Sequence, residues 1–388
     1  MRRLVAVPST ASQSTRQHLT SARHPLPNEP RPSSGAGTRS PREVLGPFDG
    51  VPMDAAVAQM PKVERHLHGE ADGRLDRILA RRAGNHPFDW TNWARRLYAH
   101  TAPGMPRLQR LRIDRRRTAE DVEALDAEPE NFIERVVDVL DEAGGEGAIY
   151  VEVRFGISTL RRPEFLPLFR EAELRAQRRW PRLRAEPLVT GLTPSQPDRW
   201  ERILPGCFEA ARVGLAGIDI IPDPYDAEAD WSGVGAWTAR AADTGLGVTV
   251  HAGEFSTANI AHAARLPGAS RLGHAVFAAA DPRLLETVQR AGVTIECCLS
   301  CNVLLGGASS YREHPVRQFV AAGIPVTLNS DDPLRVRTTI GREYAIAATL
   351  GLSWVELVEI SRNAVRAAFT TEARRRALLG VIDEATAG

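Results

Sequence analysis

Short apolar runs that are rich in β-branched residues alternate with longer segments of helical periodicity from about residue 60 onward. This alternation predicts a parallel sheet whose strands are joined by crossover helices. There are eight such runs, at residues 63–69, 148–156, 183–192, 214–221, 247–254, 270–276, 293–300 and 325–331. Eight units of this kind predict a (β/α)₈ TIM barrel. The alternative is a doubly wound open sheet, but that fold normally carries a glycine-rich phosphate loop after its first strand, and the sequence has none there.

Two segments between these runs carry clear helix signals. The apolar residues that share one helical stripe in the first segment are Phe132, Val136, Val137 and Leu140. In the second segment, Ser353 followed by Glu356 predicts a capping box that opens a helix running toward Phe369.

The first two runs are separated by residues 70–147, which is far more chain than one crossover helix needs. We therefore expect two or more extra helices, inserted after the first strand, that cap the mouth of the barrel. The insertion contains the aromatic residues Phe88, Trp90, Trp93 and Tyr98. We interpret them mainly as packing residues, although some could line a lid.

Residues 1–52 differ in composition from the rest of the chain. They are rich in Arg, Ser, Thr and Pro, contain few acidic residues and lack the apolar core of a secretory signal. Their composition resembles that of a transit peptide, but a disordered tail, or an over-extended start with Met53 as an alternative first residue, explains it equally well. We predict a disordered tail over residues 1–52 and a barrel domain over residues 53–388.

The charge and hydropathy of the chain exclude some classes of partner. A net charge of +1 gives no basic field to attract nucleic acid or an anionic membrane. No run approaches the roughly 20 apolar residues that a membrane span requires. We therefore expect a small-molecule substrate, whereas the sequence does not decide the oligomeric state.

The cysteines are Cys207, Cys297, Cys298 and Cys301, and the last three fall in one apolar stretch. Adjacent cysteines on a buried strand are a poor disulfide framework, so we predict a reducing, cytoplasmic location. The spacing of Cys298 and Cys301 could indicate metal or redox chemistry. However, no second pair completes a thiolate site, and we favour packing.

Two histidines, His66 and His68, end the first run in the sequence PKVERHLHGE. Side chains alternate along a strand, so both rings would point to the same face, which is how a strand presents two metal ligands. The pair alone is equally compatible with solvated or core histidines.

Further titratable residues decide between these readings, because each follows another predicted strand. They are His251 and Glu254 in VTVHAGE, His274 in RLGHA, and Asp331 and Asp332 in VTLNSDDP. In a TIM barrel the carboxyl ends of all strands meet at the face that carries the active site. Each motif is weak alone, but together they indicate a catalytic site for zinc or a similar divalent ion, in which three imidazoles and a carboxylate leave one position open.

With these four motifs in this order, the sequence resembles the adenosine deaminase family of metal-dependent amidohydrolases. The resemblance extends from about residue 61 to residue 369 and includes YVEVRFG and SRNAVRAAF. It implies a (β/α)₈ barrel and hydrolytic deamination of adenosine or a related aminopurine, with release of ammonia.

The resemblance also implies a role for each site residue. One Zn²⁺ per chain would be bound by His66, His68, His251 and Asp331. The ion would make hydroxide available at neutral pH, and His274 and Asp331 would orient the attacking water and manage its proton. Glu254, as the protonated acid, would donate to the purine N1, and Asp332 would hold the ring from its N7 side.

Three positions bear on substrate recognition. Glu70 falls where the family has an acidic residue that contacts the substrate periphery, but Gly69 replaces the usual apolar residue before it, so the loop could run differently. After the fourth strand, Pro222 in GIDIIPDP falls where the family commonly offers a glycine N–H to the purine N3. Proline has no N–H, and an unpaired buried acceptor costs about 1–3 kcal/mol.

Two alternatives to an aminopurine deaminase stay open from the sequence. An amidohydrolase of the same fold could act on a different amine, amide or ester, and Pro222 favours that reading. A binding protein with a deaminase-like barrel would not need every metal and proton-transfer residue, yet all are present.

Overall fold

The computed structural model describes residues 54–69, 128–194, 197–336 and 338–387. The predicted tail at residues 1–52 lies outside these residues. So do Glu70 and residues 70–127 of the predicted insertion, with all four of its singled-out aromatic residues. The described part of that insertion contains the helix α7 (Pro129–Gly145).

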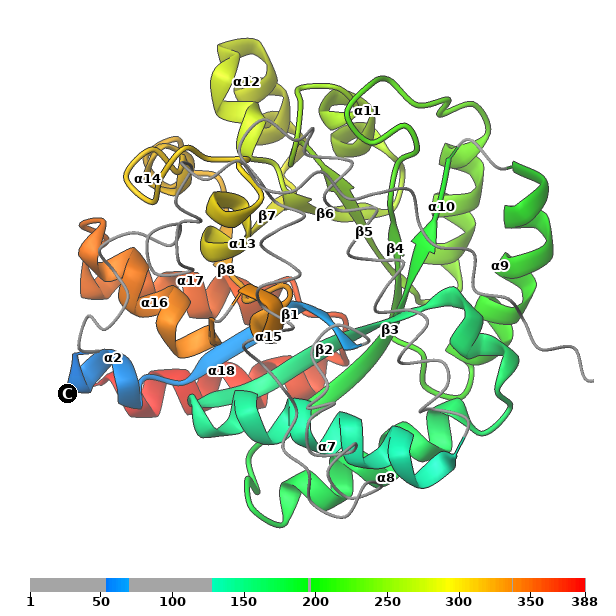
Figure 1. The fold of residues 1–388 in the computed structure, drawn as a ribbon, viewed down its shortest axis with the longest axis horizontal. Helices are drawn as coiled ribbons and strands as arrows, with labels where there is room; N and C mark the ends of the chain where they lie inside the picture. Colours follow the sequence, from blue (N-terminus) through cyan, green and yellow to red (C-terminus); the bar gives the residue numbers. More distant parts are fainter. Residues whose placement is uncertain (1–53, 70–127, 195–196, 337, 388) are drawn as a thin grey trace, which may run out of the picture. The chain divides into compact units, whose positions relative to one another are not determined.

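Eight strands form one sheet in which every neighbouring pair is parallel and follows the order of the chain. They are β1 (Lys62–His68), β2 (Ala148–Gly156), β3 (Arg184–Leu192), β4 (Gly217–Ile220), β5 (Gly247–Ala252), β6 (Ala269–His274), β7 (Thr294–Cys297) and β8 (Val326–Leu328). Each lies within or overlaps one of the predicted runs. Figure 1 shows the strands around a common centre with helices outside them, and the predicted (β/α)₈ barrel is confirmed.

The helices fill the connections between the strands. They are α2 (Ala55–Gln59), α7, η2 (Ile157–Arg161), α8 (Phe165–Gln177), α9 (Pro197–Ala211), α10 (Val234–Asp243), α11 (Ile260–Arg265), η3 (Val276–Ala280), α12 (Pro282–Ala291), α13 (Leu299–Leu304), α14 (Val316–Ala321), α15 (Pro333–Val336), α16 (Ile340–Thr349), α17 (Trp354–Arg366) and α18 (Glu372–Thr386). The predicted capping box of Ser353 and Glu356 is present at the start of α17. In α7, Phe132, Val136 and Leu140 are buried and Val137 is half-buried, as the predicted stripe requires.

Charged side chains fill much of the barrel interior below its mouth. Arg65, Glu152, Arg271 and Glu296 are fully buried. Arg271 lies 2.6 Å from Glu152 Oε2 and 2.9 Å from Glu296 Oε1. Buried charges are costly unless they are paired, so this cluster places strict requirements on the residues of four strands.

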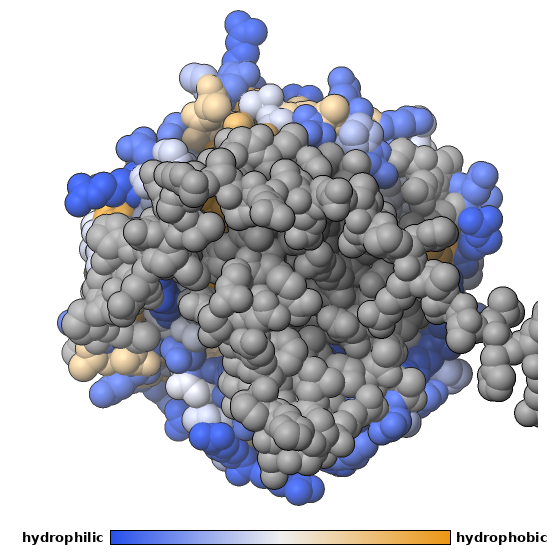
Figure 2. Space-filling model, viewed as in Figure 1, coloured by the Kyte–Doolittle hydropathy of each residue, from blue (hydrophilic) through white to orange (hydrophobic). Residues whose placement is uncertain are grey.

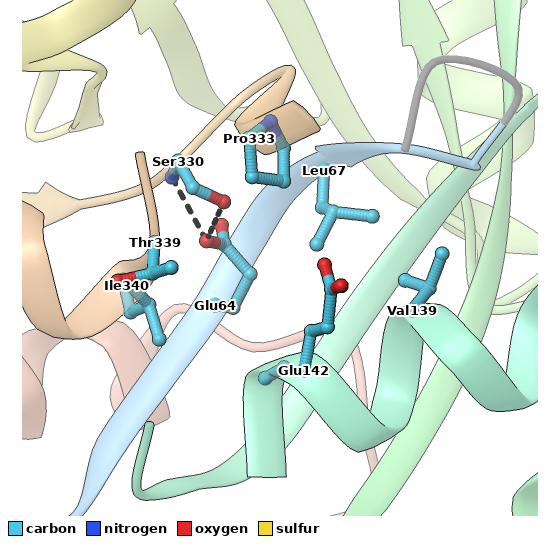
Figure 3. A pocket seen from close by; sticks show the side chains of 9 residues that line it. Glu64, Leu67, Val139, Glu142, Ser330, Pro333, Thr339 and Ile340 are labelled. Carbon is cyan, nitrogen blue, oxygen red and sulfur yellow. Dashed lines mark hydrogen bonds between the residues drawn. The ribbon is translucent and has the colours of Figure 1, made fainter. Parts of the chain in front are cut away.

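The barrel closes between β1 and β8 partly through side chains. Asn329 Oδ1 accepts from the Arg65 amide at 3.2 Å, and the Ser330 amide donates to Glu64 Oε2 at 2.8 Å. Figure 3 shows this Glu64 carboxylate bound by Ser330, in a pocket on the α7 side of β1. The backbone joins the two strands only beyond this point, where the Asp331 amide donates to the His66 carbonyl at 2.8 Å and the His68 amide to the Asp331 carbonyl at 3.0 Å.

In the view of Figure 2, most of the surface that is coloured is polar. Figure 2 shows mostly hydrophilic residues along its coloured margin, with small separate hydrophobic areas. The exposed large apolar side chains, which occur on three separate segments, are Leu174, Val213, Trp354 and Val355. Within the described ranges, every helix is too short or too polar to cross a membrane.

Candidate active site

Four histidines and one aspartate meet at the carboxyl ends of four strands. His66 and His68 come from β1, His251 from β5, His274 from β6, and Asp331 from the turn after β8. The ring centroid of His66 lies 5.3 Å from that of His68, 4.6 Å from that of His251 and 4.8 Å from that of His274. The expectation that these motifs share one rim therefore agrees with the geometry.

The candidate ligand atoms are spaced as a single metal ion requires. His66 Nε2 lies 3.1 Å from His251 Nε2 and 3.6 Å from Asp331 Oδ1, and His68 Nε2 lies 3.5 Å from the same oxygen. Ligands placed about 2.0–2.2 Å from a tetrahedral zinc ion are about 3.3–3.6 Å apart. His66, His68 and His251 thus form a group that could hold a metal ion, and Asp331 Oδ1 lies within 3.6 Å of two of these ligands.

Two buried carboxylates fix the tautomers of the candidate ligands. Glu296 Oε2 lies 2.8 Å from His66 Nδ1, and Asp219 Oδ1 lies 2.8 Å from His251 Nδ1. A carboxylate at Nδ1 holds the ring proton there and leaves a lone pair at Nε2. The two Nε2 lone pairs then face each other at 3.1 Å. Arg154 Nη1 lies 3.3 Å from His66 Nε2, and a metal cation between the two rings would bind both lone pairs, so the residues present fit a metal ion.

Arg154 joins these two carboxylates. Its Nη1 lies 3.1 Å from Asp219 Oδ2, and its Nη2 donates to Glu296 Oε2. Thr190 also donates to Asp219 Oδ2, at 2.7 Å. Burial and the nearby Arg154 charge lower the pKa of His66 well below its ordinary value, so the ring is neutral and able to bind a metal.

Two further carboxyl groups, those of Asp332 and Glu254, lie near Asp331. Burial and the neighbouring Asp332 and Glu254 raise the pKa of Asp331 well above its ordinary value. A bound divalent cation would offset this repulsion and favour the Asp331 carboxylate. The charge distribution therefore also fits a cation site.

Glu254 lies beside the candidate metal ligands and has two polar neighbours. The Tyr225 hydroxyl donates to Glu254 Oε2 at 2.8 Å, and His274 Nε2 lies 3.5 Å from the same oxygen. All three side chains are at least nine-tenths buried. Glu254 is thus held in an orientation from which its carboxyl group could exchange a proton with a bound ring.

Backbone strain and close packing occur at the same rim. His274 and Asp331 have φ angles of 67° and 64°, a left-handed conformation that is uncommon for residues other than glycine. A Cβ atom at Gly273 would lie 2.8 Å from His66 Cε1. Glycine is required there because the His66 ring occupies the space that a side chain would need.

Of the three residues proposed to contact the substrate, the structure describes Pro222 and Asp332, whereas Glu70 lies outside the described residues. Pro222 is buried and follows the end of β4, next to the rim, and Asp332 follows Asp331 and is half-buried. At Gly69, a Cβ atom would lie 2.8 Å from Val153 Cγ1 and 2.9 Å from Phe155 Cε1. The space of the missing side chain is thus filled by β2.

The four cysteines are buried and free, in agreement with the prediction that they form no disulfide. Cys298 and Cys301 pack with Leu304 and Val336. The thiol of Cys301 also forms a hydrogen bond with Asp331. Cys301 therefore both packs against apolar residues and contacts the candidate site.

Sequence reasoning missed several residues that contact the candidate ligands or the proton-transfer residues, namely Asp219, Glu296, Arg154, Tyr225 and Asn302, and it favoured packing for Cys301. Asp219 and Glu296 had a visible signal, because each is the acid in an otherwise uncharged strand, GIDI and TIEC. A charge inside a buried strand needs a partner, and its position near the carboxyl end indicates the site.

Comparisons with known proteins show the family to which the chain belongs. The model of the family described as adenosine deaminase matches residues 207–385. An adenine deaminase from Rhizobium rhizogenes is 32% identical over 254 residues, which cover 62% of this chain and 76% of that protein. The chain belongs to the adenosine deaminase family. An adenine deaminase from Rhizobium leguminosarum is 40% identical over 141 residues, but the match spans only 36% of this chain and 44% of that relative's length.

Solved structures support the family fold at low identity. An adenine deaminase from Arthrobacter aurescens has a TM-score of 0.67 at 20% identity, and the match covers 85% of this chain and 100% of that one. The N6-methyl-AMP deaminase from Arabidopsis thaliana has a TM-score of 0.65 at 20% identity, over 86% and 98%. An amidohydrolase from Burkholderia ambifaria, solved with bound zinc, has a TM-score of 0.67 at 19% identity, over 87% and 96%.

Proposed function

We propose that the protein is a zinc-dependent deaminase that hydrolyses the exocyclic amine of an aminopurine and releases ammonia. The observation that carries this proposal is the pair of carboxylate-held histidines, His66 and His251, whose Nε2 atoms face each other beside Asp331. Relatives are described as adenine and adenosine deaminases, which supports an aminopurine as the substrate class.

One Zn²⁺ per chain would be held by His66, His68, His251 and Asp331. When bound, zinc lowers the pKa of water and so supplies hydroxide at neutral pH. A related amidohydrolase has been solved with zinc, and the donor set of three imidazoles and a carboxylate suits this ion.

The chain's own residues would then perform the proton transfers. Glu254, held by Tyr225, would donate a proton to the purine N1, which makes the amine-bearing carbon more electrophilic. His274 and Asp331 would orient the attacking water, and Asp332 would hold the ring from its N7 side. Glu70 would contact the periphery of the substrate.

A second candidate function is hydrolysis of a different amine, amide or ester by the same site. Pro222 favours it, because a proline at the end of β4 offers no N–H to the purine N3. The Pro222→Gly change should then raise kcat/KM toward adenosine by roughly fivefold, which corresponds to about 1 kcal/mol. Efficient turnover of adenosine by the unchanged protein would remove the reason for this second candidate.

We also propose a domain organisation and a cellular location. Residues 53–388 would form the catalytic domain, preceded by a disordered tail at residues 1–52. Four free, buried cysteines are compatible with a reducing, cytoplasmic location.

Ammonia release tests the proposed function. The zinc-loaded protein should release ammonia from at least one member of a panel of adenine, adenosine, AMP and their N6-methyl derivatives. The Glu254→Gln variant, with the same zinc content, is the matched inactive control. If no aminopurine yields more ammonia with the unchanged protein than with this variant, the proposal is wrong.

A further inference from the structure

His274 is linked through its far ring nitrogen to two buried side chains that follow it in the chain. Its Nδ1 lies 3.1 Å from Asn302 Nδ2, and Asn302 Oδ1 lies 3.1 Å from His314 Nε2. Asn302 belongs to α13, and His314 lies in the loop before α14. Within the described part of the chain, no side-chain hydrogen bond joins Asn302 or His314 to the candidate metal ligands, so a role for them must pass through His274.

The direction of this chain of hydrogen bonds is set at its outer end. The Val316 amide donates to His314 Nδ1 at 3.2 Å. A backbone N–H can only donate, so His314 Nδ1 carries no proton. His314 is 4% exposed, and burial lowers its pKa to about 3. The ring is therefore neutral, and its single proton lies on Nε2.

The position of the His314 proton in turn determines the orientation of the Asn302 amide and the tautomer of His274. A proton on His314 Nε2 must face the amide oxygen of Asn302, which fixes the orientation of the amide group. The amide nitrogen then donates to His274 Nδ1. Since that nitrogen accepts, the proton of the neutral His274 ring lies on Nε2.

His274 is thereby given the opposite tautomer to His66 and His251. Those two rings hold the proton on Nδ1 beside a carboxylate and present a lone pair at Nε2. His274 presents an N–H, and this Nε2 lies 3.5 Å from Glu254 Oε2 and 3.9 Å from Asp331 Oδ2. By distance alone, His274 could also belong to a metal-binding group with His66 and Asp331. The hydrogen bonds to Nδ1 distinguish His274 from the candidate ligands, because they place its ring proton on Nε2.

Resting on the proposed function, we infer that Asn302 and His314 are positioning residues that hold His274 as an N–H donor at the reacting centre and keep it from acting as a metal ligand. In this state His274 Nε2–H would steady the attacking oxygen. It could neither coordinate the metal nor take up a proton at that nitrogen.

The direct test is the tautomer of His274, measured by ¹⁵N NMR of the zinc-loaded protein labelled at histidine. Assignment uses the loss of signals in His274→Gln. In the unchanged protein, the proton should be on Nε2 of His274. In Asn302→Asp, a carboxylate accepts from both neighbouring rings, and the proton of His274 should move to Nδ1. A proton on Nδ1 in the unchanged protein would overturn the inference.

Kinetics provide a second readout. Asn302→Asp should lower kcat on the order of 100-fold or more with little change in KM, because the altered group acts on the reaction step. His314→Phe removes the donor to Asn302 and should also lower kcat, whereas His314→Gln retains a donor and should restore most of it. Zinc content should stay at one ion per chain in all three variants. Unchanged kcat in Asn302→Asp, or equal losses in the two His314 variants, would contradict the inference.

These outcomes are distinct from failure of the proposed function. The tautomer can be measured in a protein that deaminates no aminopurine, and such a protein would refute the function and leave the positioning role to the NMR result. If Asn302→Asp does not fold, the two His314 variants decide the question, because they lie farther from the site and one retains a donor that the other lacks.

Discussion

Replacement of Asp219 by Asn should weaken zinc binding without removing any proposed ligand. Asp219 Oδ1 holds His251 Nδ1 at 2.8 Å, while its Oδ2 accepts from Arg154 at 3.1 Å and from Thr190 at 2.7 Å. Asparagine has only one oxygen. Because Arg154 can only donate, the amide oxygen should turn toward it, and the amide nitrogen should face His251.

The expected loss of zinc affinity follows from the tautomer of His251. An amide N–H at His251 Nδ1 moves the ring proton to Nε2, where it blocks the metal. Changes to partners of metal ligands typically cost about 10–100-fold in metal affinity, and an inverted tautomer places this change near the upper limit. That corresponds to about 2.7 kcal/mol of binding free energy. The loss of a buried charge should also lower the melting temperature.

A competition assay with a chromophoric chelator at pH 7 measures the zinc dissociation constant. The matched control is Glu152→Gln, which removes a fully buried carboxylate that lies 2.6 Å from Arg271. The control should lose stability but retain its zinc affinity. The proposed role of Asp219 is wrong if folded Asp219→Asn binds zinc as tightly as the unchanged protein, or if Glu152→Gln loses as much zinc affinity as Asp219→Asn.

Three further predictions concern other parts of the chain. Glu254→Gln should retain zinc and lower kcat by about 10²–10⁴-fold, since an amide cannot supply the proton; turnover near that of the unchanged protein would remove Glu254 from the mechanism. The pKa of His314 is lowered to about 3 in the folded state, so its stabilising contribution is complete above its ordinary pKa of about 6.5 and is lost as the pH falls toward 3, by on the order of 1 kcal/mol per pH unit. His314→Gln should therefore show a shallower fall of melting temperature over this window, and equal slopes would contradict the assignment. A chain that begins at Met53 should melt and turn over like the full chain, whereas a large drop in melting temperature would show that residues 1–52 pack on the barrel.

The sequence allowed the barrel to be predicted because local patterns determine it. Each strand lies in or overlaps a short apolar run that can be recognised without distant residues, and the capping box of Ser353 and Glu356 is complete within four residues. The rim residues were also predictable, because the fold places every strand end at one face.

The contacts that tune the site were less predictable, because they join residues far apart in the chain. His66 and Glu296 are 230 residues apart, and Arg65 and Thr327 are 262 apart. The sequence shows that Glu296 is a charge in a buried strand, but only the closed barrel shows which ring it contacts. Asn302 lies in α13, which is only six residues long, and His314 lies in a loop, so neither has a periodic pattern that indicates the direction of its side chain.

The most direct test of the proposed zinc site is anomalous X-ray scattering at the zinc edge, from crystals of the zinc-loaded protein. We expect one peak within coordination distance, about 2.0–2.2 Å, of His66 Nε2, His68 Nε2, His251 Nε2 and Asp331 Oδ1, with His274 Nε2 outside that distance. A peak elsewhere, a peak bonded to His274, or no peak in zinc-saturated crystals would contradict it.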